Sequence, residues 1–477
     1  MPTRGPLVGT EVMMLAFFRS FRLSPGFLRH RMISATTQSF ALAMTILFPV
    51  MVCLTGQAQA AGLIRDAETE YMLREFGEPI FRAAGLDPRA VNLHIVNDNS
   101  LNAFVAGGQR MFIHTGLMLK ADRPNMLIGV MAHETGHMAG GHLSRTQDAL
   151  KGAAVPVVIS TLLGIGAIVA GAGDVGMALI TGGQTLAQRN FLQYSRIQEA
   201  SADQAAITYL DRVGWSGKGM MDTFYLFRGQ EVLSERQQDP YLRSHPLSTQ
   251  RLSALEDRVT TSPYYDVVDP PVWVSQFEMV KAKLWGFLDN PALTFRRFPA
   301  ADQSLPAHYA RAVAFHRRGD AARALAELEP VLTAMPNNPF AWELKGQILF
   351  ESGKVEESIA PQRRAVDLAP NSPLLRVGLA QSLISTETTE NTVEGLEHLQ
   401  FAERFDKENS RAFHQASIAY ARLGEYGNAE LATAERFYVL GQLPRAKQHA
   451  KRAQNELPSG SPGWLRAEDI LQEQVRE

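Results

Sequence analysis

The chain has 477 residues, of which 45% are hydrophobic and 20% are charged. This length accommodates about three domains, and 8% aromatic residues argue against a disordered chain. A small scaffold held by internal disulfide bonds is excluded, because Cys53 is the only cysteine. Basic residues number 47 and acidic residues 49, so the net charge of -2 provides no basic excess for binding nucleic acid. We therefore expect a folded, multidomain protein with no nucleic-acid partner.

Residues 1–60 have the order of a secretory signal peptide. An uncharged apolar run from Phe40 to Leu54 follows several arginines and precedes the small-x-small cleavage sequence Ala58-Gln59-Ala60. The run is too short to span a membrane comfortably. Cleavage removes Cys53, and a mature chain without cysteine suits an oxidising compartment such as the bacterial periplasm. The alternative is lipidation of Cys53, which is disfavoured because Val52 occupies a position where a lipidation motif has a small residue.

The segment after the leader, residues 61–261, has the pattern of a mixed α+β domain. Apolar periodicity predicts its helices, and the turn-forming pair Gly107-Gly108 lies between its two predicted strands. Because Asp269-Pro270-Pro271 interrupts helical structure, we expect residues 262–301 to link this domain to the next. The predicted helices are 63–86, 123–143, 186–212 and a block from 215 to about 255, and the predicted strands are 90–96 and 110–114.

An H-E-x-x-H motif, His133-Glu134-Thr135-Gly136-His137, lies within the helix predicted over 123–143. Histidines four positions apart project from one face of an α-helix, close enough to share a zinc ion. Glu134 lies on the adjacent face, where it can take a proton from a water at the metal. The motif therefore predicts one Zn²⁺ per chain.

A catalytic zinc needs a third protein ligand, and the sequence offers two candidates. His142 follows Gly140 as in an extended zinc motif but comes one residue too early, and a continuing helix would point it about 140° away from His137. Glu199 is the better candidate. Asp203, one helical turn later, shares its face and could hydrogen-bond the second ring nitrogen of a ligating histidine.

The segment from Ala154 to Ala172 is apolar and uncharged, and its length of about 28 Å approaches the thickness of a bilayer. Its glycines and Pro156 make it a poor rigid span, and a single crossing would separate Glu199 from His133. We expect residues 154–172 to form a flexible hairpin over the active site that makes peripheral contact with a membrane. A buried core hairpin is the alternative, and an intramembrane peptidase would require a true span.

The region beyond residue 300 repeats with a period of 34 residues. Gly319 and Gly353 are related by this period, as are Pro336 and Pro370. Helix-breaking residues at this interval are typical of tetratricopeptide repeats, so residues 302–477 are predicted to form an α-solenoid of four or five helical pairs. Residues 386–391 interrupt the third pair.

These motifs occur in an order that resembles the HtpX-type and CAAX-prenyl-protease-like zinc metallopeptidases. The resemblance implies a mainly α protein, with a zincin-like α+β peptidase domain and a small edge sheet followed by the repeats. It also implies that zinc binds His133, His137 and Glu199 and that Glu134 is the general base and acid. The motifs that carry it are Asn102-Ala103-Phe104, Gly107-Gly108, His114-Thr115-Gly116-Leu117, His133-Glu134-x-x-His137, Glu199-x-x-x-Asp203 and His245-Pro246 with Arg251.

The same resemblance implies two further roles. The strand with Asn102, Ala103 and Phe104 would pair with an extended substrate, although an ordinary buried strand is the alternative. His245 and Arg251 would stabilise the oxyanion of the transition state, or His245 would instead be a regulatory fourth zinc ligand that displaces the water.

The cleaved leader and the repeats make the chain similar to the periplasmic branch of this family. The resemblance implies a zinc endopeptidase that degrades misfolded or stalled outer-membrane protein precursors and supports their assembly, with the repeats recruiting clients or the assembly machinery. The alternative is a largely non-proteolytic chaperone or scaffold that acts through its repeats.

Overall fold

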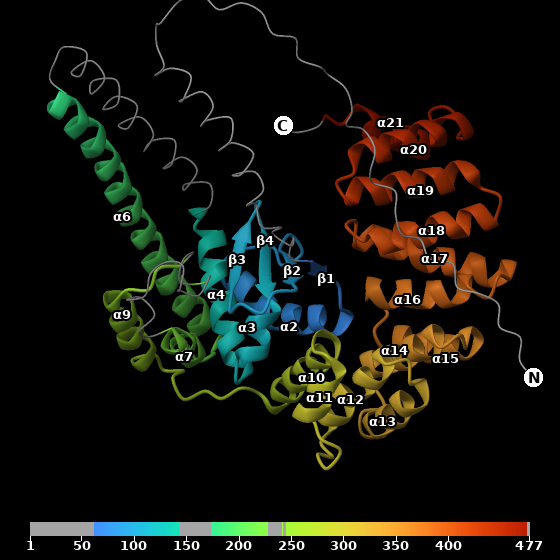
Figure 1. Ribbon diagram of the computed structural model, residues 1–477, viewed down its shortest axis with the longest axis horizontal. Helices are drawn as coiled ribbons and strands as arrows, with labels where there is room; N and C mark the ends of the chain where they lie inside the picture. The colour runs from blue at the N-terminus through green and yellow to red at the C-terminus, as the bar shows by residue number, and fades with distance from the viewer. Residues whose placement is uncertain (1–61, 143–172, 228–240, 242–244, 475–477) are drawn as a thin grey trace, which may run out of the picture. The chain divides into compact units, whose positions relative to one another are not determined.

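The computed structural model describes residues 62–142, 173–227, 241 and 245–474 (Figure 1). The predicted signal peptide, 1–60, and the apolar segment 154–172 lie outside these residues. No helix in the described part of the chain is long and apolar enough to cross a membrane. The fold is mainly α-helical with one small sheet, as the sequence predicts.

The sheet has four strands in the order β1-β2-β4-β3. The central pair β2 and β4 is parallel, with Ile95 opposite Ile113, and both outer pairs are antiparallel. The sequence pattern did not predict β1, and it predicted β3 without bounds. β3 lies at one edge of the sheet. The strands are β1 (Leu63–Ile64), β2 (Asn92–Val96), β3 (Ala103–Ala106) and β4 (Arg110–His114).

Helix α4 (Pro124–Ala139) is the centre of the first domain. Pro124 begins the helix at a position where a missing N–H costs nothing, and every residue from Pro124 to His137 is buried. Apolar side chains of α4 join those of α2, β2 and β4 in one core. Because α4 is covered on all sides, any polar group on it must find a partner inside the protein. The neighbouring helices are α2 (Ala67–Ala83), α3 (Thr115–Lys120), α6 (Gly173–Val213), α7 (Lys218–Leu226) and α9 (Thr249–Thr260).

The segment expected to link the two domains contains helices α10 (Pro271–Leu288) and α11 (Pro291–Arg297). Pro271 starts α10 rather than preventing it, since proline is favoured in the first turn of a helix. Phe277, Val280 and Leu284 of α10 are buried in the same core as α4. The segment is therefore helical and packed, and the exact domain boundary stays a prediction.

Five helical pairs follow one another between residues 305 and 472 (Figure 1). Gly319, Gly353, Gly424 and Gly460 take the left-handed conformation in the turns within pairs, at φ of 74° to 83°. The third pair has a longer turn in which Glu387 has a φ of 63°, at the interruption seen in the sequence. The helices are α12 (Leu305–Arg317), α13 (Ala321–Ala334), α14 (Pro339–Glu351), α15 (Val355–Leu368), α16 (Pro373–Ile384), α17 (Thr389–Phe405), α18 (Ser410–Arg422), α19 (Tyr426–Val439), α20 (Leu443–Glu456) and α21 (Pro462–Gln472).

Candidate metal centre

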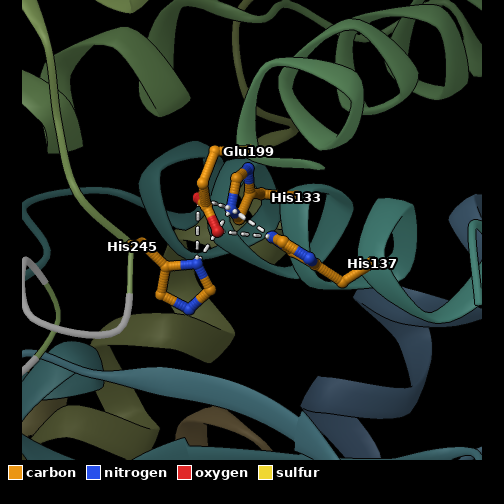
Figure 2. Close-up of side chains that lie close together, drawn as sticks. All are labelled: His133, His137, Glu199 and His245. Carbon is orange, nitrogen blue, oxygen red and sulfur yellow. Dashed lines mark hydrogen bonds and ion pairs between the residues drawn. The ribbon is translucent and has the colours of Figure 1, made fainter. Parts of the chain in front are cut away.

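Four side chains from three parts of the chain converge beside α4 (Figure 2). His133 and His137 project from α4, Glu199 comes from α6, and His245 comes from the segment before α9. One ligand atom from each lies within 4.8 Å of the other three. All four are buried, with exposed fractions between 0% and 8%.

The distances suit a shared cation. The Nε2 atoms of His133 and His137 are 3.1 Å apart, and each lies 3.4 Å from a different carboxylate oxygen of Glu199. Two imidazole nitrogens and a carboxylate form a donor set typical of zinc and related divalent metals. Burial alone would raise the pKa of Glu199, but His245 and the hydrogen bonds from His133 and His137 hold it well below its ordinary value. The carboxylate is thus in its ligating form.

Gly136 allows α6 to approach α4 closely enough to bring Glu199 to the histidines. A Cβ atom at position 136 would lie 2.8 Å from the backbone oxygen of Ala202, which is shorter than real contacts of this kind. Thr135, the other unspecified residue of the motif, donates its hydroxyl to the carbonyl of Met131. The absence of a side chain at Gly136 therefore sets the distance between the two ligand helices.

A second layer of polar groups holds His133 in place. Asp203 Oδ1 lies 2.9 Å from His133 Nδ1, the ring nitrogen that faces away from the cluster. Arg251 donates two hydrogen bonds to Asp203, at 2.8 and 2.9 Å. Burial favours protonation of Asp203, but the contacts with His133 and Arg251 lower its pKa. An anionic Asp203 fixes the tautomer and orientation of a ligating imidazole.

Arg251 connects this layer to the segment that carries His245. Its Nη1 donates to the carbonyl of Pro246 at 2.7 Å and lies 3.2 Å from Glu199 Oε2. Its guanidinium thus contacts one member of the cluster, Glu199, and two groups beside it, Asp203 and the Pro246 carbonyl. This arrangement favours a positioning role for Arg251 over direct contact with substrate.

Glu134 is completely buried between α4 and the edge strand β3. Burial raises the pKa of its carboxyl, against the opposing effects of His245, His133 and the backbone N–H of Val105. Its Oε1 lies 3.3 Å from His245 Nε2. A carboxyl beside the ligand cluster with a raised pKa has the properties of a general base and acid.

His245 thus has one ring nitrogen among the ligands and one toward Glu134. Its Nδ1 lies 3.2 Å from Glu199 Oε2 and 3.3 Å from His133 Nε2. Tyr241, which no sequence motif indicated, stacks on the His245 ring at 4.7 Å and on Phe227 at 5.1 Å. The available signal is the spacing of four between Tyr241 and His245, and the His245 N–H donates to the Tyr241 carbonyl at 2.7 Å.

The predicted substrate strand corresponds to β3 and the residue before it. Ala103 is fully buried and Asn102 is 8% exposed, while Phe104 stacks on Phe112 of β4 at 4.9 Å. The amide oxygen of Asn102 has no hydrogen-bond partner among the described residues. β3 pairs with β4 along one side and is the last strand of the sheet, so its other side is an edge within the described residues.

The sequence itself identifies the first domain. Residues 67–259 match the sequence profile of peptidase family M48. This part of the chain is an M48 peptidase domain. The matched range begins with α2 and ends within α9, so it contains all four clustered side chains.

Relatives extend the similarity beyond this domain to most of the chain. The beta-barrel assembly-enhancing protease of Escherichia coli (strain K12) is 25% identical over 411 residues, 84% of this chain and 82% of that protein. The protein of the same name from Yersinia pestis is 24% identical over 81% of this chain and 79% of its own. Metalloprotease LoiP of Escherichia coli (strain K12) is 29% identical over 41% of this chain and 74% of its own.

Among solved structures, the tetratricopeptide protein YrrB, described as having an unusual peptide-binding site, aligns with 37% of this chain and 91% of its own. The TM-score is 0.30 and the identity 18%. The M48 domain and the relatives, together with the cluster that could hold a metal, make this chain a metalloprotease.

Proposed function

We propose that this metalloprotease is a periplasmic zinc endopeptidase that cleaves misfolded or stalled outer-membrane protein precursors and supports their assembly. The observation that carries the peptidase activity is the convergence of four ligand atoms within 4.8 Å beside the buried Glu134. The cellular role is supported by the relatives named beta-barrel assembly-enhancing protease, which match over more than four-fifths of the chain.

His133, His137 and Glu199 are the proposed zinc ligands. A bound zinc ion would polarise the substrate carbonyl and lower the pKa of water. Asp203 holds the outer nitrogen of His133, and Arg251 in turn holds Asp203. These contacts therefore orient His133 toward the site that would hold the metal.

Glu134 is the proposed proton carrier. One carboxylate oxygen accepts the proton of the water that attacks the peptide carbonyl, and the same carboxyl returns that proton to the nitrogen of the leaving amine. The scissile C–N bond breaks as a new C–O bond forms, so both fragments leave with complete termini. The neighbouring β3 edge is the proposed site where Asn102, Ala103 and Phe104 align an extended substrate by strand addition.

His245 is the proposed fourth zinc ligand of the resting enzyme. Its Nδ1 lies at hydrogen-bond distance from both Glu199 and His133. It would therefore take the fourth position at the zinc, which a catalytic site leaves to a water molecule. Activity then requires His245 to withdraw. This geometry also favours the alternative function, a scaffold that holds its zinc mostly silent and acts through the repeats.

The deciding experiment compares zinc content and casein cleavage for the wild type, Glu134→Gln and His245→Ala. All three should hold about one zinc. Glu134→Gln should lose cleavage by a factor of about 10² to 10⁴, because it removes the proton carrier. His245→Ala should digest casein faster than the wild type, because the fourth ligand is gone. Glu357→Gln, which changes an exposed glutamate of the repeats, is the matched control and should behave as wild type.

Other outcomes select other functions. Loss of cleavage in His245→Ala, with zinc retained, would assign His245 to transition-state stabilisation. Zinc without cleavage in every variant, and undiminished support of outer-membrane protein assembly by Glu134→Gln, would favour the scaffold. Recovery of the mature protein by osmotic shock tests the periplasmic location.

A further inference from the structure

His142 lies against one of the proposed ligands without being one itself. The distance between His142 Nδ1 and His137 Nδ1 is 3.0 Å, and the two rings meet edge to face at 83°. His137 Nε2 is the nitrogen that faces His133 and Glu199. His142 therefore contacts the ring of His137 on the side opposite the cluster.

This contact exists because α4 ends earlier than the sequence predicts. The helix stops at Ala139, Gly140 caps it, and Gly141 has a φ of 61°, a conformation that side chains disfavour. The chain turns back, so His142 does not take the direction that a continuing helix would give it. A Cβ atom at position 140 would lie 2.5 Å from His142 Nε2, so the missing side chain of Gly140 makes room for the ring.

His142 is also fixed to the second ligand helix. Gln198 of α6 donates its side-chain amide to the His142 carbonyl at 3.3 Å, and Gln198 immediately precedes Glu199. His142 is 5% exposed, and Gln198 is likewise buried. The turn after α4 is thus held between the two helices that supply the proposed ligands.

The chemistry of a ligating imidazole gives this arrangement a role. A histidine that binds a metal through Nε2 keeps its proton on Nδ1, and that N–H needs an acceptor to fix the ring. At His133 the group beside Nδ1 is the carboxylate of Asp203, with its Oδ1 at 2.9 Å. At His137 the group in the equivalent place is the Nδ1 of His142.

We propose that His142 is the positioning residue of the metal centre that accepts a hydrogen bond from His137 Nδ1–H and thereby orients its Nε2 toward the metal. The proposal rests on the proposed function, because it assumes that His137 is a ligand. A neutral His142 with its own proton on Nε2 satisfies the geometry. The two ligands of α4 then have different supports, a carboxylate for one and an imidazole for the other.

The test measures zinc affinity by chelator competition on the mature chain, for the wild type, His142→Leu and His142→Asn. His142→Leu has no acceptor, so zinc should bind about 10- to 100-fold more weakly, the usual cost of removing such a partner. His142→Asn places an amide oxygen near the position of Nδ1 and should retain affinity within about threefold. His94→Leu is the control, because it removes a half-buried histidine of β2 that stacks on Phe112.

A second pair of variants reaches the same contact without changing a histidine. Gly140→Ala should displace the His142 ring and weaken zinc binding, whereas Gly62→Ala, where no atom lies within 4 Å, should not. The melting temperature of each metal-free variant, and its rise with zinc, separates loss of metal affinity from loss of folding.

The outcomes distinguish the two proposals. Tight zinc binding by His142→Leu would overturn the role of His142 while leaving the metal site intact. Equal weakening in His142→Asn and His142→Leu would also overturn it, because the acceptor would then not matter. A wild type that binds no zinc would overturn the proposed function itself.

Discussion

The metal centre and the repeat array are built in opposite ways. The centre joins residues distant in sequence, since His133 and His245 are 112 positions apart, and its contacts are buried polar pairs at defined distances. The array joins neighbouring helices, and its cores are small clusters rich in alanine and leucine. A buried polar contact is lost when one of its atoms moves out of hydrogen-bond distance. Apolar packing instead loses stability in proportion to the volume of side chain that is removed. Damage to one region should therefore leave a different signature from damage to the other.

The largest expected effect is at a proposed ligand. Glu199→Gln replaces an anionic metal ligand, whose carboxylate oxygens lie 3.4 Å from the Nε2 atoms of His133 and His137, with a neutral amide. Zinc affinity should fall by more than about 100-fold, beyond the cost of losing an outer partner, and casein cleavage should disappear. Zinc titration checks the first effect and gel assay the second. Wild-type affinity would remove Glu199 from the ligand set.

The array should show a large loss of stability with no loss at the metal. Leu344 of α14 is fully buried in the core of the first repeats, so Leu344→Ala should lower the free energy of unfolding by about 3 kcal/mol. Zinc affinity should stay unchanged. Urea unfolding followed by circular dichroism, with zinc titration in parallel, tests both statements. A parallel fall in zinc affinity would show that the two regions are not independent.

Gly136→Ala should damage the metal centre and leave the packing of the repeat array unchanged. The added methyl group meets the backbone of Ala202 at 2.8 Å and must push α6, with Glu199, away from α4. A displacement of about 1 Å at a catalytic site can cost about 100-fold in rate. We expect such a fall in kcat/KM together with weaker zinc binding. Gly463→Ala, whose nearest contact is a flexible leucine at 3.1 Å in the array, is the control and should change neither.

The smallest effect concerns a carboxyl where α2 contacts the first repeat helix. Glu68 is buried and accepts a hydrogen bond from Tyr309 at 2.8 Å. Burial raises the pKa of Glu68 to about 7, against the opposing effect of Lys283. Since the folded-state pKa lies above the unfolded value, the protonated form contributes stability below about pH 4.5 that is lost as the pH rises through 7.

Glu68→Gln should abolish this loss. Its stability relative to the wild type should increase by about 1 to 3 kcal/mol between pH 5 and pH 8. Melting temperatures of both proteins at the two pH values test the sign. An equal fall in the melting temperature of both proteins from pH 5 to pH 8 would show that the titrating group is not Glu68.

The sequence predicted the features that depend on local spacing. His133 and His137 are four apart on one helix, Glu199 and Asp203 are likewise four apart, and the period of 34 residues gave the helical pairs. Features that depend on tertiary approach escaped prediction. The turn at Gly141 that brings His142 to His137 requires a φ of 61° that no periodicity encodes. Tyr241 reaches His245 through stacking rather than through a motif.

The close approach at Gly136 also limits how far this motif can be moved. Transplanting the five residues His133 to His137 onto a helix of another protein would transfer two imidazoles and a carboxylate. It would not transfer the backbone of a second helix within van der Waals contact of the fourth residue. A designer who treats that position as free would obtain two histidines on a surface. The host scaffold must supply the inter-helix distance before the motif can become a centre.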